Sequence, residues 1–393
     1  MRSVAIVGAS LAGARAAQQL RAQGFDGRVV LVGEEPHLPY DRPPLSKGFL
    51  AGTTGREALD LLDADDTASL ELRLGCRAEG LDPAGGRVVL ADGDLVVDAV
   101  VLATGARART LPGTDGVAGV HVLRTLDDAL ALRAELVPGT RVVVVGGGFI
   151  GAEVASTCRT LDLDVTVLEA LPTPLVRVLG PRLADVCAAL HERHGTTLRC
   201  GAAVDELVTT QDGDRRRVTA VRLASGEELP ADVVVVGVGA VPATDWMAGS
   251  GLTIDNGVHT SSGLVTSIPN VVAIGDVAAY TCADTGLRRR HEHWTNASDQ
   301  AVVAVANLLA GHQVRDYRPS GYVWSDQYSG TLQLAGHPGP DDEVVFVEGT
   351  PEDGAFVATY LRDGEVVAVF GLNSPKQFNR LRRQALRRPA TAA

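Results

Sequence analysis

Two glycine-rich segments of this sequence have the residue types and spacing that hold the phosphates of a dinucleotide. Gly146, Gly148 and Gly151 complete a G-x-G-x-x-G pattern that follows an apolar run and precedes a helical one. Glycine permits a tight turn and lets a pyrophosphate reach the N–H groups at the start of the helix. The spacing predicts a dinucleotide-binding loop that includes Ile150, and Glu169 follows the next strand, where a carboxylate can meet a ribose hydroxyl.

The other loop lies near the start of the chain and departs from the pattern at one position. Gly8 and Gly13 are present, but Ser10 stands where the second glycine is usual. The loop follows an apolar strand, opens a helix and has Glu34 at the spacing expected of a ribose-binding acid. A strand-to-helix turn that binds nothing is the alternative for either loop. Two such loops predict two nucleotide cofactors, and a flavin with a nicotinamide is the useful pairing, because a flavin accepts a hydride and passes electrons on.

A third chemical feature is Asp276, which follows the apolar run 271–274 through a single glycine. This places a carboxylate at the C-terminal edge of a predicted parallel sheet, where ligands bind in doubly wound folds. An aspartate that merely forms a turn is the alternative.

The cysteines and histidines indicate no metal site and no local redox disulfide. The five cysteines are scattered without C-x-x-C or C-x4-C spacing, so buried thiols are expected at Cys76, Cys158, Cys187, Cys200 and Cys282. His291 and His293 flank Glu292 on an expected strand after three arginines, and a metal or acid–base role for them is disfavoured.

The elements that position these residues occur twice. A strand, a glycine loop, a helix, a second strand and an acid occupy 3–34 and again 141–169. Each copy continues through a hairpin and an apolar strand into glycine, at Thr104-Gly105 and at 237–239. Runs such as 142–145 are apolar throughout, which is typical of strands buried on both faces of a parallel sheet.

From residue 322 the pattern changes to short strands followed by a final helix over 374–388. The sequence therefore predicts an α/β protein with two Rossmann-like dinucleotide-binding domains, for FAD and NAD, and a C-terminal α+β domain. We expect the first domain to be discontinuous, over 1–113 and 240–318, with the second over 114–239 and the third over 319–393.

Charge and hydropathy exclude other classes of function. The net charge of −12 repels nucleic acid and anionic lipid, so neither is an expected partner. No apolar run approaches the ~20 residues of a membrane helix, and the first residues lack a signal-peptide pattern. We expect a cytoplasmic protein.

The motifs in this order resemble the pyridine nucleotide–disulfide oxidoreductase superfamily. The segments PYDRPPLSK (39–47) and WSDQY (324–328) make the chain similar to its NADH-dependent ferredoxin reductases of oxygenase systems, over essentially the whole length. The resemblance implies FAD in the first fold and NADH in the second. It implies a small iron–sulfur ferredoxin as partner, which feeds an oxygenase or a P450.

The same resemblance implies roles for individual residues. It places the FAD pyrophosphate at Ala12 and Gly13, the ribose at Glu34, and adenine near the backbone of Ala78. The remaining FAD contacts that it implies are Gly8, Ser10, Lys47, Ala103, Thr104, Gly105, Arg124, Asp276 at the ribityl chain, and Trp294 near the ring. For NADH it implies Gly146, Gly148, Ile150, Gly151, Glu153, Glu169 and Gly239.

Lys47 and Glu153 are the expected catalytic residues. Prolines at 43 and 44 stiffen the entry to a short helix near Leu45, which holds Lys47 in place instead of leaving it mobile in solvent. We expect a cation near the flavin edge, paired with Glu153 one turn into the second loop's helix. A solvated surface lysine is the alternative.

The segment 41–62 contains no cysteine, although disulfide reductases of this superfamily carry a cysteine pair near the flavin. Electrons therefore have no thiol exit there, and an external one-electron acceptor is expected. The alternatives are a rubredoxin reductase, an NADH oxidase, or a flavoprotein of the apoptosis-inducing-factor type whose redox state controls association.

The arginines and Trp324 are left with two interpretations each. Arg288–Arg290 and the C-terminal arginines 380, 382, 383, 387 and 388 form either solvated surface or a ferredoxin dock. Trp324 is either part of the C-terminal core or a lid on the flavin through which electrons leave.

Overall fold

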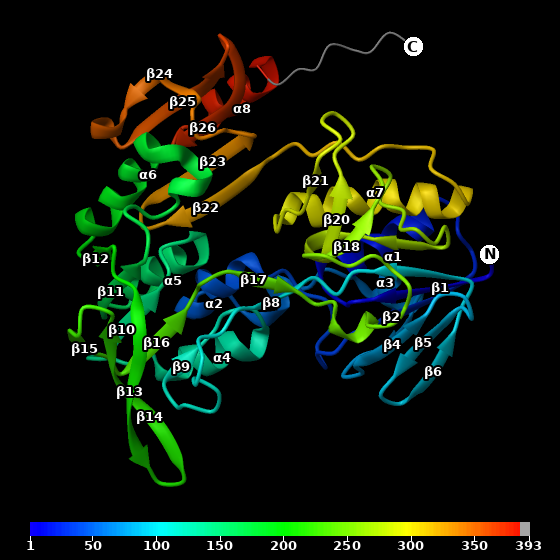
Figure 1. The fold of residues 1–393 in the computed structure, drawn as a ribbon, viewed down its shortest axis with the longest axis horizontal. Coiled ribbons are helices and arrows are strands. Elements are labelled where there is room, and N and C mark those ends of the chain that lie inside the picture. Colours follow the sequence, from blue (N-terminus) through cyan, green and yellow to red (C-terminus); the bar gives the residue numbers. More distant parts are fainter. Residues whose placement is uncertain (386–393) are drawn as a thin grey trace. The chain divides into compact units, whose positions relative to one another are not determined.

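The structure is a computed structural model that describes residues 1–385, and its chain forms two compact units (Figure 1). Unit 1 comprises Met1–Asp41, Arg56–Arg107 and Ala240–Pro319, and unit 2 comprises the rest, including Arg42–Gly55. The short segment that carries Lys47 thus packs with unit 2, although it lies between two segments of unit 1 in the sequence.

Unit 1 is built on a five-stranded parallel sheet. Its strands, in spatial order, are β19 (Val271–Ala273), β7 (Ala99–Leu102), β1 (Ser3–Val7), β2 (Arg28–Val32) and β3 (Glu71–Arg73). The strands β1, β7 and β19 are buried almost completely, because both faces of the sheet are covered.

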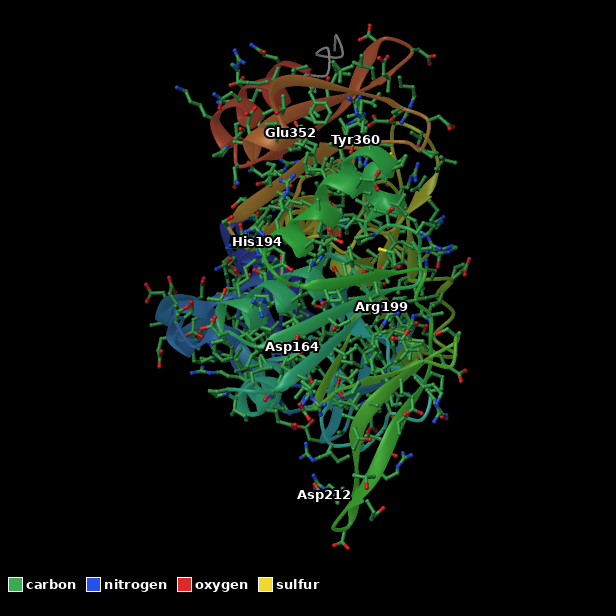
Figure 2. The ribbon with its side chains drawn as sticks, turned by 90° about the vertical axis from the view of Figure 1, so that its left-hand side faces the viewer. Asp164, His194, Arg199, Asp212, Glu352 and Tyr360 are labelled. Carbon is green, nitrogen blue, oxygen red and sulfur yellow. The ribbon has the colours of Figure 1, made fainter. Side chains whose placement is uncertain are left out.

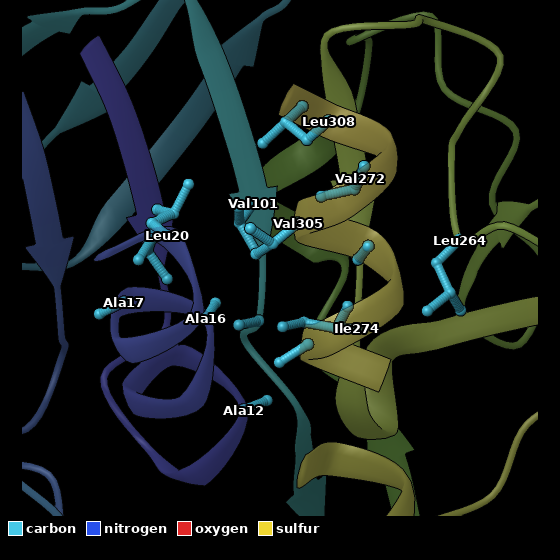
Figure 3. Close-up of a cluster of buried hydrophobic side chains, with 14 of the residues drawn as sticks. Ala12, Ala16, Ala17, Leu20, Val101, Leu264, Val272, Ile274, Val305 and Leu308 are labelled. Atoms are coloured by element: carbon cyan, nitrogen blue, oxygen red, sulfur yellow. The ribbon is translucent and has the colours of Figure 1, made fainter. Parts of the chain in front are cut away.

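Two helices cover one face of this sheet, α1 (Leu11–Ala22) and α7 (Trp294–Ala310). Small side chains on α1, such as Ala16, allow a close approach to α7, and Leu20 packs with Val101 of β7 and Val305 of α7 (Figure 3). The tight α1–α7 packing brings the glycine loop at the start of α1 near the loop that follows β19.

Smaller elements complete unit 1. One antiparallel sheet holds β4 (Ala78–Asp82), β5 (Arg87–Leu90) and β6 (Gly93–Val96), and another mixed sheet holds β18 (Val258–Thr260), β20 (Ala278–Thr281) and β21 (Arg288–Arg289). Short helical turns are η2 (Arg56–Leu59), α3 (Ala64–Ala68), η3 (Asp245–Met247) and η4 (Gly275–Val277). A separate two-stranded sheet pairs β8 (Ala106–Ala108) with β17 (Ala240–Pro242).

Unit 2 repeats the parallel architecture. Its sheet runs in the order β12 (Thr197–Cys200), β11 (Asp164–Glu169), β10 (Arg141–Val145), β16 (Val233–Val236) and β9 (Val120–His121). Packed near it are η1 (Pro43–Ser46), α2 (Gly48–Ala51), α4 (Leu126–Glu135), α5 (Phe149–Thr160) and α6 (Val176–Arg193), which is kinked at Gly180. A long ribbon of β13 (Val204–Asp212), β14 (Arg215–Leu223) and β15 (Glu228–Pro230) has Asp212 at its tip (Figure 2).

The C-terminal part of unit 2 is an antiparallel sheet followed by a helix. The strands lie in the order β22 (Val323–Gln327), β23 (Gly330–Gly336), β26 (Glu365–Leu372), β25 (Ala355–Arg362) and β24 (Glu343–Thr350), with the turn η5 (Pro351–Asp353) and helix α8 (Pro375–Ala385). Leucines of α6 pack against Phe356, Tyr360 and Phe370 of this sheet, and Tyr360 donates a hydrogen bond to the carbonyl of Leu179 at 2.8 Å.

The fold class predicted from the sequence is confirmed: there are two parallel α/β sheets with glycine loops and a C-terminal α+β sheet. The exact domain boundaries stay a prediction. One local expectation is wrong, because residues 291–293 form no strand; His293 instead precedes α7 as its N-cap. The final helix is described only to Ala385, so Arg387 and Arg388 lie outside the described residues.

Candidate dinucleotide and electron-transfer site

The first glycine loop is shaped by close backbone contacts that only glycine allows. Gly8 has φ of +117°, and a Cβ there would lie 2.1 Å from the carbonyl oxygen of Ala103. A Cβ on Gly13 would lie 1.9 Å from the Gly8 carbonyl oxygen. Ser10 precedes α1 as its N-cap, so the serine occupies the one position of the pattern where the backbone is extended (φ −120°, ψ −160°).

The second loop repeats this geometry. Gly146 has φ of +104° and a Cβ would meet the Gly237 carbonyl oxygen at 2.3 Å, while a Cβ on Gly151 would meet the Gly146 carbonyl oxygen at 2.1 Å. Gly148 is the N-cap of α5, and a Cβ there would find no atom within 4 Å. Gly148 therefore faces open space, which leaves room for a ligand at the start of α5, beside the exposed Ile150.

Both loops fit the pyrophosphate of a dinucleotide. Each is followed by a 12-residue helix, and neither helix has an acidic residue in its first turn. The N–H groups of a helix start carry partial positive charge and bind anions when no carboxylate occupies them. The N–H groups at both helix starts can therefore donate hydrogen bonds to phosphate oxygens.

The two predicted ribose-binding acids differ in how they are held. Glu169 ends β11, and its two oxygens accept hydrogen bonds from the N–H groups of Gly147 at 2.9 Å and Leu171 at 2.8 Å. This carboxylate is fixed directly beside the second loop. Glu34 follows β2, is exposed, and forms an ion pair with Arg77 at 3.3 Å.

The other predicted FAD residues of unit 1 lie on several of its elements, and Gly275, just before Asp276, contacts the first helix directly. Gly275, with φ of +71°, lies against Ala12: a Cβ on it would be 3.0 Å from the Ala12 side chain, so Asp276 follows at the first loop. Trp294 begins α7 and donates its indole N–H to Asp41 at 2.7 Å. Thr104 donates its hydroxyl to the Ala243 carbonyl at 2.9 Å, Gly105 has φ of +67°, and Ala78 begins β4.

Lys47 and Glu153 form the expected ion pair. Lys47 Nζ lies 2.8 Å from Glu153 Oε2, and Glu153, in the second turn of α5, is 4% exposed. The lysine, which follows the turn η1, also donates to the Pro43 carbonyl at 3.2 Å. The alternative of a solvated lysine is therefore wrong. Arg124, another predicted contact, precedes α4, and its carbonyl accepts a hydrogen bond from Arg42.

The structure adds polar partners that sequence analysis did not single out. Ser46 donates its hydroxyl to Glu153 Oε2 at 2.5 Å, and Ser325 of β22 donates to Oε1 at 2.7 Å. Thr157, one turn beyond Glu153, donates to the Ser46 carbonyl at 2.7 Å. Both serines lie within the segments that carried the family resemblance, and this was the one feature of the sequence that could have pointed to them. Gly239, the remaining predicted NADH contact, has φ of +104° and open space at its Cβ position.

The predicted docking arginines are only partly available at the surface. Arg382 lies over the ring of Tyr322, 4.5 Å from its centroid, and Tyr322 stacks on Trp324 with ring centroids 6.0 Å apart. Arg288 donates to two backbone carbonyls, and Arg290 pairs with Glu292 at 2.6 Å. Arg380 pairs with Glu348 at 3.4 Å. Arg383 donates only to the Asn379 carbonyl of its own helix among the described contacts, and both it and Arg289 are exposed, which makes these two the better candidates.

The cysteine thiols of the protein have low reactivity. All five cysteines are free, and four of them are buried as expected, whereas the expectation of a buried thiol is wrong for Cys200, which is exposed. Burial raises the pKa of the Cys158 and Cys187 thiols to about 12. Among residues 1–385 no three His, Cys, Asp or Glu side chains are arranged to hold a metal ion, and no helix is long and apolar enough to cross a membrane.

Comparison with known proteins decides the family. Residues 2–301 match the profile of the pyridine nucleotide-disulphide oxidoreductases, and residues 322–392 match that of the reductase C-terminal domain. The chain belongs to the pyridine nucleotide-disulphide oxidoreductase family. The chain carries two dinucleotide-type loops and has no cysteine in the segment 41–62.

Within this family the chain is similar to ferredoxin reductases along nearly its whole length. It is 39% identical to a ferredoxin–NAD(P)(+) reductase from Sphingomonas sp, over 95% of this chain and 90% of the relative. It is 36% identical to putidaredoxin reductase from Pseudomonas putida, over 96% and 90% of the two chains. The solved covalent complex of putidaredoxin reductase with putidaredoxin superposes with a TM-score of 0.91 at 34% identity, covering 98% of this chain and 93% of that one. The predicted resemblance and the assignment as an oxidoreductase of this type are confirmed.

Proposed function

We propose that this protein is an FAD-dependent reductase that takes electrons from NADH and passes them to a small iron–sulfur ferredoxin, which feeds an oxygenase or a P450. The observation that carries the proposal is the pair of tightly packed glycine loops, each followed by a helix with no acidic residue in its first turn, in a chain without a cysteine in the segment 41–62. Relatives named as ferredoxin reductases along the whole length support the choice of carrier. FAD, when bound, accepts two electrons as a hydride and releases them singly.

The proposal gives each glycine loop, and the charged residues near it, a part in cofactor binding. The N–H groups at the start of α1, with Ala12 and Gly13, bind the FAD pyrophosphate, and Asp276 binds the ribityl chain. The start of α5 and the fixed Glu169 carboxylate bind NADH. Lys47, held by Glu153, supplies a cation of defined position to the flavin edge.

The cytoplasmic location expected from the sequence is a further part of the proposal. The five free cysteines support it, because disulfides form mainly in oxidising compartments and thiols persist in reducing ones.

A comparison of electron acceptors tests this function. The FAD-loaded protein is supplied with NADH, and its rate of NADH oxidation is measured with putidaredoxin, with rubredoxin and with oxygen as alternative acceptors. We expect the highest kcat/KM with the iron–sulfur ferredoxin. A higher kcat/KM with rubredoxin would reassign the carrier, and a rate with oxygen that neither protein increases would identify an NADH oxidase.

A further inference from the structure

The carboxylate of Glu153 is buried and is held by groups from two separate stretches of the chain. Lys47 Nζ and the Ser46 hydroxyl approach Oε2, and the Ser325 hydroxyl approaches Oε1. Glu153 belongs to α5, Ser46 and Lys47 to the turn after β2 and before α2, and Ser325 to the first strand of the C-terminal sheet. The ion pair that the proposed function requires is therefore assembled with a group from the C-terminal sheet.

A buried carboxylate needs this number of partners. Burial of a charge costs several kcal/mol unless its oxygens are paired and hydrogen-bonded. The ion pair with Lys47 and the Ser46 hydroxyl satisfy Oε2, and Oε1 relies on Ser325, which is 0% exposed. Without that donor, Glu153 keeps its charge in the interior with one oxygen unsatisfied, and its side chain is free to turn away from Lys47.

The Ser325 hydroxyl is itself oriented by a neighbour on the same strand. Gln327 is buried and donates its amide to Ser325 Oγ at 3.1 Å, so the Ser325 proton points to Glu153. Ser325 and Gln327 lie two residues apart and therefore on one face of β22, the face that meets α5. The same helix face receives a second hydrogen bond from the hairpin, because Ser156 accepts from the N–H of Tyr328 at 2.5 Å.

We propose that Ser325 is a positioning residue for the reductase reaction: its hydroxyl, oriented by Gln327, fixes the Glu153 carboxylate and thereby the position and exposure of the Lys47 ammonium. The inference rests on the proposed function for its meaning, but the position of Lys47 can be measured without electron transfer. The Lys47–Glu153 pair of unit 2 is then incomplete without the C-terminal sheet of the same unit.

The small number of lysines in the sequence makes the exposure of the Lys47 ammonium easy to measure by chemical modification. Of the 36 basic residues in the chain, Lys47 and Lys376 are the two lysines, and Lys376 is exposed at the start of α8. Acetylation of the FAD-loaded protein with acetic anhydride, followed by mass spectrometry, gives the ratio of Lys47 to Lys376 modification. The Lys376 signal corrects each sample for reagent and pH.

The test compares Ser325→Ala with Ser325→Thr, Gln327→Met and Ser156→Ala. We expect Ser325→Ala to raise the Lys47/Lys376 ratio about threefold or more, since a hydrogen bond to a charged group is lost. Ser325→Thr, which keeps the hydroxyl, should restore the wild-type ratio, and Gln327→Met should raise it less. Ser156→Ala removes the other hydrogen bond between the same hairpin and helix, but leaves both Glu153 oxygens paired, so its ratio should stay at the wild-type value.

The outcomes separate this inference from the proposed function. An unchanged ratio in both Ser325→Ala and Gln327→Met would overturn the inference, and so would an equal rise in Ser156→Ala, which would indicate general loosening of the C-terminal sheet. If Ser325→Ala does not fold, the Lys47/Lys376 ratio of Gln327→Met tests the inference instead: a raised ratio supports it and an unchanged ratio overturns it. The visible absorption of FAD on addition of NADH is recorded in parallel: a changed spectrum in Ser325→Ala with a normal one in Ser156→Ala supports the positioning role. A shifted ratio in a protein that does not oxidise NADH would leave the inference standing and reject the proposed function.

Discussion

At the scale of single residues, Glu169 combines a structural and a recognition task. Its two oxygens hold the N–H groups of Gly147 and Leu171, which places a negative charge beside the second loop. The adjacent stretch Leu171, Pro172 and Thr173 contains no cation to offset that charge. A 2′-phosphate would be repelled there, whereas ribose hydroxyls can donate to the carboxylate.

We therefore predict that the protein prefers NADH over NADPH, and that Glu169→Arg reduces the preference roughly tenfold, by reversing one charge near the 2′ position. Glu169→Gln, which keeps one oxygen acceptor, should fall between the two. The ratio of kcat/KM for the two nucleotides measures the effect. Equal or better use of NADPH by the wild-type protein would contradict this assignment of Glu169.

At this scale, residues with their own chemical signature could be found from sequence and their supporting partners could not. The Lys47–Glu153 pair was predicted because Lys47 follows two stiffening prolines in a segment that carries the family resemblance, and Glu153 lies one turn into the helix of the second loop. Ser46 and Ser325 are ordinary serines, separated by most of the chain, and only tertiary packing brings both to Glu153. The roles assigned to the cofactor-binding residues stay predictions.

At the scale of elements, the two loops show which glycines serve the fold and which leave room for a ligand. Gly151 is crowded, because its Cβ would lie 2.1 Å from the Gly146 carbonyl oxygen, whereas Gly148 has open space and φ of −70°. Ser10 occupies the position in the first loop that corresponds to Gly148, so a side chain is compatible with the fold there.

The same substitution at these two glycines should thus have opposite consequences. Gly148→Ala should leave the unfolding temperature within error of the wild type and raise the KM for NADH several-fold, because its methyl group enters the ligand's space. Gly151→Ala should destabilise the protein by about 1–3 kcal/mol, since backbone must move. Thermal unfolding measures the stability of each variant, and steady-state kinetics measures its KM for NADH. A destabilised Gly148→Ala protein with normal NADH affinity would contradict the assignment.

Another element-level feature is the contact between α6 and the β22–β23 hairpin. Tyr328, at the hairpin tip with φ of +55°, stacks on His194 with ring centroids 4.6 Å apart and meets His191 Nδ1 at 2.7 Å. Burial lowers the pKa of His191 to about 4, with a smaller effect of the nearby His194. At a pH below the ordinary histidine pKa of ~6.5, His191 binds a proton in the unfolded chain but stays neutral in the folded protein until the pH approaches 4.

Stability should therefore decrease as the pH falls from about 6.5 to 4, by about 2 kcal/mol at pH 5 from His191 alone. His191→Asn keeps a polar atom near the Nδ1 position but does not titrate, so its stability should depend less on pH in that range. Urea unfolding followed by the fluorescence of the protein at pH 7 and pH 5 measures the difference. Parallel pH profiles of the two proteins would show that His191 is not the group responsible.

Sequence predicted the repeated strands and glycine-loop helices because their apolar runs and turn residues are local signals. It left helices α4 and α6 unassigned, and it placed a strand at 291–293 where His293 caps α7. The helix α6 is stabilised by packing on the C-terminal sheet, across an interruption at Gly180 and Pro181 that hides its periodicity. Stabilisation by residues that are distant in the sequence leaves no local pattern from which the helix could be predicted.

At the scale of the whole molecule, a net charge of −12 opposes the approach of an acidic ferredoxin, so local positive charge must guide it. Of the C-terminal arginines, Arg382 is engaged with Tyr322, whereas Arg383 is exposed. A reversal of Arg382 would also disturb the ring that stacks on Trp324, so Arg383 alone is the cleaner site for a test.

We predict that Arg383→Glu raises the KM for ferredoxin about threefold or more at low salt and flattens its dependence on ionic strength. The rate with ferricyanide, a small acceptor that needs no docking surface, should stay unchanged. Arg215→Glu, at an exposed position of the β13–β14 ribbon, makes the same change in net charge and should have little effect. Equal effects of the two variants would mean that net charge, not a local dock, governs the encounter, and Arg289 would then be tested in the same way.

The central claim is that electrons from NADH leave this protein for an iron–sulfur carrier without passing through a thiol. The most direct measurement mixes the FAD-loaded protein anaerobically with a known amount of NADH and excess putidaredoxin, and then determines reduced putidaredoxin together with the number of reactive protein thiols. We predict two molecules of reduced putidaredoxin for each NADH consumed and an unchanged thiol count. Consumption of NADH with a change in reactive thiols and no reduced carrier would contradict it.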